Sequence, residues 1–336
     1  MDIAHIDPLD LDLDIADAIA DTDRASVAAT GLALAPPVGP TRMKTLQLGS
    51  NGRPVAGLWL ARDADRLVGY GFAHLPVEDN TDAAYLGGAV HPDARRRGLG
   101  RALVDAAVGL AGAEGRTRIY SSAWRGSDGV PALRALGFSA DGLGVNAVRR
   151  VDVHGAPHGQ WDRLYDEASA RASAYELVHL VGPTPAELLP DMVTLHAAIN
   201  DAPLGDPASE PDHWDTERVR AYDRAMAERR QTVYRVLARH RTTGDWAGLS
   251  MLCVDEFDPT IAHQEDTSVV RAHRGHRLGL LMKAGMLRWV AHERPEVAAT
   301  DTWNDVTNHH MIAVNERLGA SLIGYNESFR LREAGL

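Results

Sequence analysis

A turn rich in arginine and glycine is the part of this sequence that most directly suggests chemistry. It lies in the segment AVHPDARRRGLGRALVDAAV (89–108), between a run typical of a strand and a run typical of an amphipathic helix. Gly98 and Gly100 allow the backbone to approach an anion closely, and the amides at a helix start point toward such an anion. The turn therefore predicts a diphosphate site, although a charged turn that only begins a surface helix is the alternative. The arginines that would add positive charge are Arg95, Arg96, Arg97 and Arg101.

A second segment, SVVRAHRGHRLGLLMKAGML (268–287), repeats this pattern. Four residues of the first segment, Val90, Arg95, Leu99 and Gly100, match Val269, Arg274, Leu278 and Gly279 at a constant offset of 179 residues. Leu136-Gly137 and Leu318-Gly319 form another matched pair at nearly the same spacing. An offset this long favours two copies of one domain over a short structural repeat. Because GAPHGQ (155–160) is a typical chain break, we expect one copy in residues 1–153 and the other in 154–336.

The elements around these turns predict the fold class. In each copy, strand-like runs come first, and helices and strands then alternate. In the first copy the helix is expected over about 99–110, and in the second over about 278–292. A helix followed by a strand is expected over 161–183, opening the second copy. We therefore expect an α/β (α+β) protein with two tandem domains, each a mixed, mostly antiparallel sheet flanked by helices.

With these landmarks the chain resembles a tandem member of the GNAT superfamily of acyl-CoA-dependent N-acetyltransferases. The signature of that family is Gln/Arg-x-x-Gly-x-Gly/Ala after the fourth strand, with Leu-Gly-Phe at the end of a later helix. The first copy carries Arg95-Arg96-Arg97-Gly98-Leu99-Gly100 and Leu136-Gly137-Phe138. The second carries Arg274-Gly275-His276-Arg277-Leu278-Gly279 and Leu318-Gly319-Ala320, with Arg277 where the first has Gly98. The organisation is similar to that of tandem GNAT enzymes such as mycothiol synthase.

The resemblance implies acetyl-CoA as the acyl donor. The strand edge at Ala89 and Val90 would hold the pantetheine arm by strand-like hydrogen bonds, and a strand amide would stabilise the developing oxyanion. The cofactor-binding positions would be Ala89, Val90, Arg95, Arg96, Arg97, Gly98, Leu99, Gly100, Arg101, Val269, Val270, Arg274, Arg277 and Gly279. Asn304 and Asn308 are further candidates for cofactor binding, or alternatively they cap the start of a helix.

Acid–base residues are expected on the fourth strand of the second copy. His263, Glu265 and Asp266 are the catalytic candidates there, with a polar, solvated strand entry as the alternative. Strict alternation would place His263 and Glu265 on one face of the strand and Asp266 on the other. The tyrosine that many GNAT enzymes use as an acid is replaced by Leu133 and Asn315.

Acidic residues before this strand are candidates for the acceptor site. Asp201 and Asp206 would attract a cationic amine, although an ordinary solvated loop is the alternative.

Composition narrows the partners. A net charge of −11 and a pI near 5.7 argue against nucleic acid and anionic membranes, and one cysteine excludes a disulfide framework. The acidic start lacks the pattern of a secretory signal, no apolar run reaches about 18 residues, and no metal site is expected. We expect a cytoplasmic acetyltransferase that acts on a primary amine of a small molecule, with a homodimer as a candidate assembly. The alternatives are a non-catalytic acyl-CoA sensor and a protein-lysine acetyltransferase.

Overall fold

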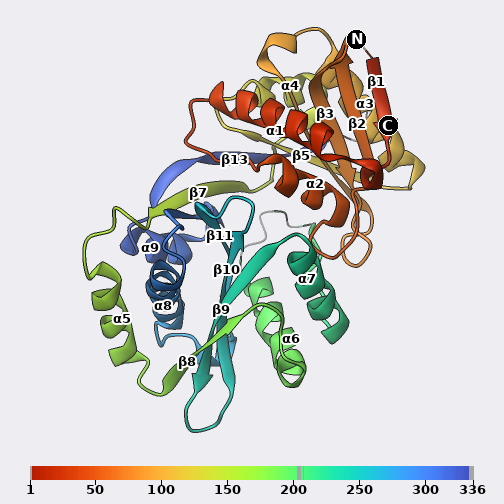
Figure 1. Cartoon of the computed structure of the whole chain (residues 1–336). Coiled ribbons are helices and arrows are strands. Elements are labelled where there is room, and N and C mark those ends of the chain that lie inside the picture. Colours follow the sequence, from red (N-terminus) through yellow and green to blue (C-terminus); the bar gives the residue numbers. More distant parts are fainter. Residues whose placement is uncertain (1, 203–205, 207, 333–336) are drawn as a thin grey trace. The chain divides into compact units, whose positions relative to one another are not determined.

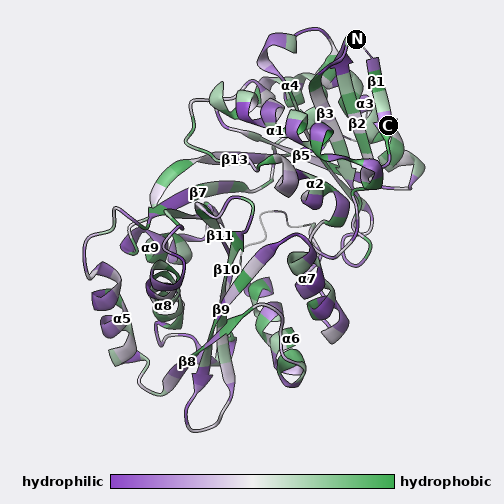
Figure 2. Cartoon of the chain, in the orientation of Figure 1, coloured by the Kyte–Doolittle hydropathy of each residue, from purple (hydrophilic) through white to green (hydrophobic). Residues whose placement is uncertain are grey.

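The computed structural model describes residues 2–202, 206 and 208–332. They form two compact units, one from residues 2–146, 206, 208–211 and 324–332, and the other from 147–202 and 212–323 (Figure 1). Each unit is a sheet with helices packed on it, as predicted. Strands such as β2, β3 and β10 contain many hydrophobic residues, whereas helices such as α1 and α7 carry both hydrophobic and hydrophilic residues (Figure 2).

The first unit is built on the strand order β1-β2-β3-β4-β5-β13, in which only the β4–β5 pair is parallel. Its strands are β1 (Asp2–Ile6), β2 (Gly57–Asp63), β3 (Arg66–His74), β4 (Ala83–Val90), β5 (Arg118–Trp124) and most of β13 (Ser321–Leu331), with the short β6 (Phe138–Ser139) pairing with β13. Its helices are α1 (Leu13–Ala28), α2 (Gly39–Leu48), α3 (Leu99–Ala113) and α4 (Gly129–Ala135).

Helix α3 follows the predicted turn and packs on the sheet through one face. Leu99, Leu103, Ala107 and Ala111 are buried and recur every four residues, which is the spacing of a helix face. They join one core cluster with Trp59 and residues of β3, β4 and β5. The helix start is thereby held at the end of β4.

The second unit repeats this arrangement with the strand order β8-β9-β10-β11-β12-β7, in which β11 and β12 are parallel. Its strands are β8 (Tyr175–Val181), β9 (Gln231–His240), β10 (Trp246–Asp255), β11 (Ile261–Val269), β12 (Ala299–Asp305) and most of β7 (Val145–Asp152). Its helices are α5 (Gln160–Arg171), α6 (Leu189–Ala197), α7 (Thr216–Glu228), α8 (Leu278–Glu293) and α9 (His309–Arg317). The short 3-10 turns are η1 (Pro8–Asp10) and η2 (Pro92–Ala94) in the first unit, and η3 (Ala186–Leu188), η4 (Ala198–Asp201) and η5 (Arg271–His273) in the second.

Helix α8 is buried on most of its circumference. It contacts β9, β10 and β11 on one side and α5 on the other, and its residues form the main core of the unit. Lys283 lies within this helix and is only 5% exposed.

Each sheet takes its last strand from the other half of the sequence. Most of β13, at the end of the chain, completes the sheet of the first unit, and most of β7, which precedes residue 154, completes that of the second. The division of the two copies at 153/154 stays a prediction, because these units describe packing and not the duplicated stretches. Among the described residues, no helix is both long and apolar enough to cross a membrane.

Candidate functional site

In both units, the two parallel strands pair over a few residues and then part. The β4–β5 register runs from Ala83 and Arg118 to Tyr85 and Tyr120, although β4 continues to Val90. The β11–β12 register runs from Ile261 to Gln264 on β11, which continues to Val269. Since Tyr85 and Gln264 are also 179 residues apart, the strands part at the same position in both copies. The freed strand edge can bind an extended chain that carries amides.

The predicted turn in the first unit leaves its backbone amides free. Gly98 has a φ of +84° and is the N-cap of α3, and a Cβ built on it would meet no heavy atom within 4 Å. Among the described residues, the amides of 96–101 donate to no protein acceptor. Six N–H groups at the start of a helix are a suitable site for a diphosphate.

Arg95 holds this turn rather than leaving its charge free. Its Nε donates to the Val90 carbonyl at 3.1 Å, and its terminal nitrogens bind Asp128 at 2.8 Å and Ser26 at 3.0 Å. Arg274 makes the same Nε bond to the Val269 carbonyl, also at 3.1 Å. The guanidinium therefore positions the turn in both copies, and its direct contact with a phosphate stays a prediction.

The other arginines of the first turn differ in whether their side chains have protein partners. Arg97 pairs with Asp63 at 3.2 Å, and Arg101 donates to the Ala135 carbonyl at 3.4 Å. Arg96 is exposed and has no protein partner in the described part of the chain. The side chain of Arg96 is thus the one most available to a bound anion.

The second turn has the same backbone shape with a different placement of glycine. Gly275 and Arg277 have φ values of +88° and +59°, and their counterparts Arg96 and Gly98 have +63° and +84°. Each turn therefore keeps one arginine in the left-handed region, which costs about 1 kcal/mol. The Arg277 side chain forms an ion pair with Glu167 of α5, so α5 orients the guanidinium. Gly279 follows in the first turn of α8, and a Cβ built on it meets no heavy atom within 4 Å.

A β-bulge on β11 carries two of the predicted catalytic residues. Ser250 of β10 pairs with Thr267, and Leu252 pairs with Gln264, so Met251 alone lies opposite Glu265 and Asp266. The Gln264 amide reinforces this bulge by donating to the Met251 carbonyl. The bulge begins where β11 parts from β12, and it interrupts the strict alternation on which the expected strand faces depended.

Both carboxyls at the bulge are held toward their neutral forms. The crowded protein around Glu265 reduces its hydration, although part of the side chain reaches solvent, and Asp266 adds repulsion, so its pKa is raised to about 7. Burial and the charge of Asp212 raise the pKa of Asp266 to about 6. A carboxylate whose pKa lies near neutrality is suited to accept a proton at physiological pH.

His263 lies just before the bulge and differs from the carboxyls. Burial lowers the pKa of its imidazole, and nearby Asp301 and Asp255 oppose this effect. Asp301 is opposite His263 in the strand register and accepts two hydrogen bonds from Arg150, at 2.6 and 2.7 Å. A neutral His263 could accept a proton, so its role as a base stays a prediction.

Three further residues, two near Glu265 and one near Asp266, were not identified from the sequence. Tyr222 and Arg229 come from α7 and its C-cap and interact electrostatically with Glu265, and Tyr222 Oη lies 3.8 Å from the buried thiol of Cys253. Burial raises the pKa of that thiol, as expected for a core cysteine. Asp212, in the connection before α7, is the third. No local spacing links α7 to β11, so only the packing reveals these neighbours.

The remaining predicted residues are spread over both units. Asn308 caps α9 by accepting from the Met311 amide at 3.2 Å, whereas Asn304 accepts from Asn315 at 2.6 Å. Asp201 pairs with Arg274 in the second unit. Their cofactor and acceptor roles stay predictions.

Two other predicted residues make contacts in different units. Asp206 accepts from Tyr120 at 2.7 Å and belongs to the first unit, so it does not share a unit with Asp201. Val270 donates its amide to the Ala247 carbonyl at 2.9 Å, and its own carbonyl accepts from the His273 amide at 2.8 Å, so both of its backbone polar groups already have protein partners. The acceptor role of Asp206 and the cofactor role of Val270 stay predictions.

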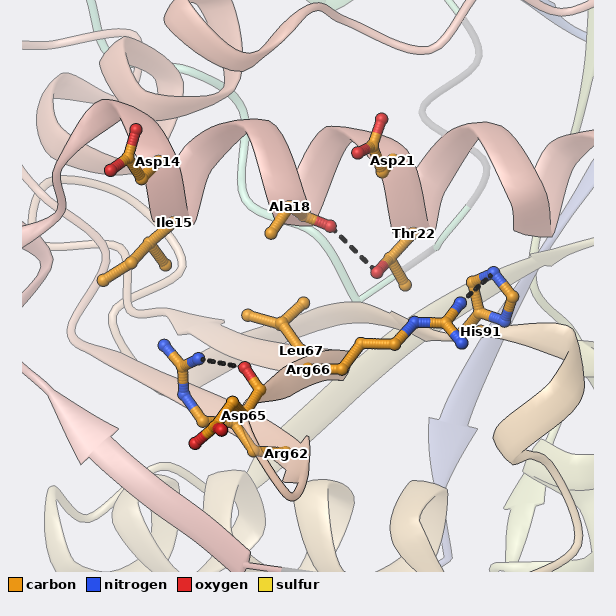
Figure 3. A pocket seen from close by; sticks show the side chains of 10 residues that line it. All are labelled: Asp14, Ile15, Ala18, Asp21, Thr22, Arg62, Asp65, Arg66, Leu67 and His91. Atoms are coloured by element: carbon orange, nitrogen blue, oxygen red, sulfur yellow. Dashed lines mark hydrogen bonds between the residues drawn. The ribbon is translucent and has the colours of Figure 1, made fainter.

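Two cavities lie apart from these features. One, of about 410 Å³, lies in the first unit between α1 and the β2–β3 hairpin, with Asp14 and Asp21 on the helix side and Arg62 and Arg66 on the hairpin side (Figure 3). The other, of about 710 Å³, lies in the second unit and includes Trp289. None of the predicted site residues lines either cavity, and the described residues hold no group of three or more side chains placed to bind a metal ion.

Known proteins share this architecture. The family model for the acetyltransferase (GNAT) family matches residues 31–138. A tandem GNAT protein from the clavulanic acid biosynthesis pathway is 25% identical, with a TM-score of 0.77 over 99% of this chain and 98% of that one. This chain is therefore similar to tandem GNAT proteins over almost its whole length, and its residues 31–138 match the acetyltransferase (GNAT) family.

Other solved structures share the fold of this chain. A GCN5-related N-acetyltransferase from Sphaerobacter thermophilus is 14% identical, with a TM-score of 0.68 over 98% of this chain and 95% of that one. A glucosamine N-acetyltransferase region of a fungal multi-domain β-N-acetylglucosaminidase is also 14% identical, with a TM-score of 0.64 over 98% of this chain and 37% of that one. No curated protein matches the sequence.

Proposed function

We propose that the second unit transfers an acetyl group from acetyl-CoA to a primary amine of a small molecule. The observation that carries this proposal is the bulge at Glu265 and Asp266, which places two carboxyls where β11 parts from β12. In an acetyltransferase fold this is the strand whose free edge is available to the donor. The chain thus has a proton acceptor beside the expected path of the acyl group.

The residues of the second unit fit the donor. The amides from Gly275 to Leu280 donate to no protein acceptor in the described chain and would bind the diphosphate. The β11 edge beyond Gln264 would bind the pantetheine amides, and a β11 amide would donate to the thioester oxygen as negative charge develops there. Acetyl-CoA supplies the activated acetyl group.

The carboxyls of the bulge handle the proton. An ammonium group has no lone pair for attack, so the acceptor must lose a proton before or during transfer. Reduced hydration, together with repulsion from Asp266, raises the pKa of Glu265 to about 7, and Glu265 accepts that proton directly or through a water. In their ionised forms, these carboxyls also attract a cationic acceptor. The departing thiolate takes its proton from water, since Leu133 and Asn315 cannot act as acids.

The first unit is proposed to bind acetyl-CoA without performing the transfer. Within the part of the chain that the structure describes, its turn offers six free amides and an Arg96 side chain without a protein partner, which suit a diphosphate. At the positions of Glu265 and Asp266, however, it has Leu86 and Gly87, which cannot accept a proton. The sensor interpretation therefore applies to this unit. The cytoplasmic location and the homodimer stay predictions.

A panel of small amines with acetyl-CoA, followed by thiol release, tests the proposal. We expect turnover with the wild-type chain and a fall in kcat of at least about 100-fold in Glu265→Gln, the usual contribution of a general base. Glu187→Gln is the matched control, because Glu187 is an exposed glutamate of the same unit outside the site. Unchanged kcat in Glu265→Gln, or no turnover with any amine by the wild type, would contradict the proposal.

A further inference from the structure

Three histidines surround Tyr175 near the second turn, which precedes α8. His273 and His276 belong to the turn itself, and His240 ends β9. Their ring centroids lie 5.8, 5.4 and 5.1 Å from that of Tyr175, and His240 lies 6.2 Å from His273. Tyr175 is buried, so it is a fixed centre around which the imidazoles are arranged.

Hydrogen bonds orient two of these rings. The Tyr175 hydroxyl lies 3.1 Å from His273 Nδ1, and the Thr243 amide donates to His240 Nδ1 at 3.2 Å. When Tyr175 donates to Nδ1, the proton of the neutral His273 ring is on Nε2, on the opposite side of the ring. His276 is exposed and lies between the two left-handed residues of the turn, next to free amides.

The first turn has no such cluster. At the offset of 179 residues, Ala94 takes the place of His273, and Arg97 takes the place of His276. At these two positions the first turn carries an alanine and one permanently charged arginine, whereas the second carries two imidazoles, the side chain that ordinarily changes charge between pH 5 and 8. Because the two turns share one backbone shape, this difference in side chains is what distinguishes them as anion sites.

Other charged groups around the cluster are mostly paired. Arg241 binds the Tyr175 carbonyl at 3.0 Å and pairs with Glu176, and Asp245 binds Thr243. Arg274 pairs with Asp201, and Arg277 with Glu167, which also binds Arg317. Arg271, at the start of the turn, has no ion-pair partner among the described residues. No carboxylate binds the three imidazoles directly in the described chain.

We propose that His273 and His276 bind the phosphates of coenzyme A in the second unit as imidazolium groups, with Tyr175 positioning His273. This inference rests on the proposed function, because it assumes that the second unit holds coenzyme A. The consequence is an affinity that rises as the pH falls through the neutral range. The first unit, whose turn carries arginines, lacks this dependence.

The direction of this pH dependence follows from the charges of the ligand and of the imidazoles. A bound polyanion favours a positive charge on the rings, so binding takes up protons as the pH falls. Each proton taken up changes the dissociation constant by up to about tenfold per pH unit. The phosphates of the ligand also titrate near pH 6, with the opposite effect, so the decisive comparison is between variants with the same ligand.

Titration calorimetry of the full chain with free coenzyme A tests this inference. The first site is weakened by Gly98→Asp, which places a carboxylate among the amides of that turn, because aspartate tolerates the left-handed backbone better than most residues. In that background we compare His273→Gln/His276→Gln with His292→Gln, an exposed histidine near the other end of α8. Buffers of different ionisation enthalpy report the number of protons taken up. Tyr175→Phe tests the positioning role.

Coenzyme A should bind the Gly98→Asp protein at least about threefold more tightly at pH 6.0 than at pH 7.5, relative to the double histidine variant, with net proton uptake. The double variant should lose the uptake, His292→Gln should retain it, and Tyr175→Phe should reduce it. Equal pH dependence with and without the two histidines would overturn the inference and leave the proposed function standing. Failure of the Gly98→Asp protein to bind coenzyme A at any pH would overturn both.

Discussion

Replacing Lys283 with methionine is expected to stabilise the second unit, by an amount that depends on pH. Lys283 is 5% exposed within α8 and forms no ion pair in the described part of the chain. Burial lowers the pKa of its ammonium from 10.5 to about 7. Between these two values the folded state binds fewer protons than the unfolded state, so the free energy of unfolding rises with pH across that window.

The size of the effect follows from the same pKa. Keeping Lys283 buried costs at most about 4 kcal/mol at pH 7 and about 1 kcal/mol at pH 10, since one pH unit corresponds to 1.36 kcal/mol. Methionine fills similar space without a charge. Lys283→Met should therefore gain most of its stability near neutral pH and little at pH 10.

Urea unfolding at several pH values between 6 and 10 measures this difference. The matched control is Lys44→Met, because Lys44 is the one other lysine of the chain and is partly exposed on α2. We expect no pH-dependent gain in the control. A gain for Lys283→Met that is equal at pH 7 and pH 10, or a loss at pH 7, would refute the reasoning.

Three further changes test other parts of the account. With an acceptor amine that is neutral throughout the range, kcat/KM should rise with pH with an apparent pKa near 7, and Glu265→Gln should flatten the profile; a profile that is the same in both proteins would contradict a role for this carboxyl. Arg150→Met should lower the free energy of unfolding by about 3 kcal/mol or more, because it leaves the buried Asp301 unpaired, whereas Arg163→Met, on the exposed face of α5, should change it by less than about 0.5 kcal/mol; equal effects in urea unfolding would argue against the buried pair. Cys253 should react with iodoacetamide only as fast as the protein unfolds, since its thiol is buried and its pKa is raised, and rapid labelling of the folded chain would show otherwise.

The turns and the helices that follow them could be predicted from the sequence because their signals are local. Glycine and arginine at fixed spacing, followed by apolar residues every four positions, specify a strand, turn and helix without reference to distant residues. The duplication made this interpretation stronger, and the structure shows that it extends to the Nε bonds of Arg95 and Arg274. The fold class followed from the same patterns.

Other features depend on partners far along the chain and could not be predicted. The bulge at Glu265 exists because β10 pairs out of register with β11, and no single strand reveals its partner's register. The exchange of β7 and β13 between units depends on the whole topology. Arg277 adopts a left-handed backbone that its residue type disfavours. Gly275, two residues earlier, is the residue of this turn whose type indicates a left-handed backbone.

A matched pair of aspartate variants shows which of the two units carries out the transfer. Arg277→Asp and Gly98→Asp place a carboxylate at equivalent left-handed positions of the two turns, where it repels a diphosphate. Initial rates of thiol release against acetyl-CoA concentration give kcat/KM for each. We predict a loss of at least about 100-fold in Arg277→Asp and a much smaller loss in Gly98→Asp. A large loss in Gly98→Asp with little change in Arg277→Asp would place the chemistry in the first unit and contradict the account.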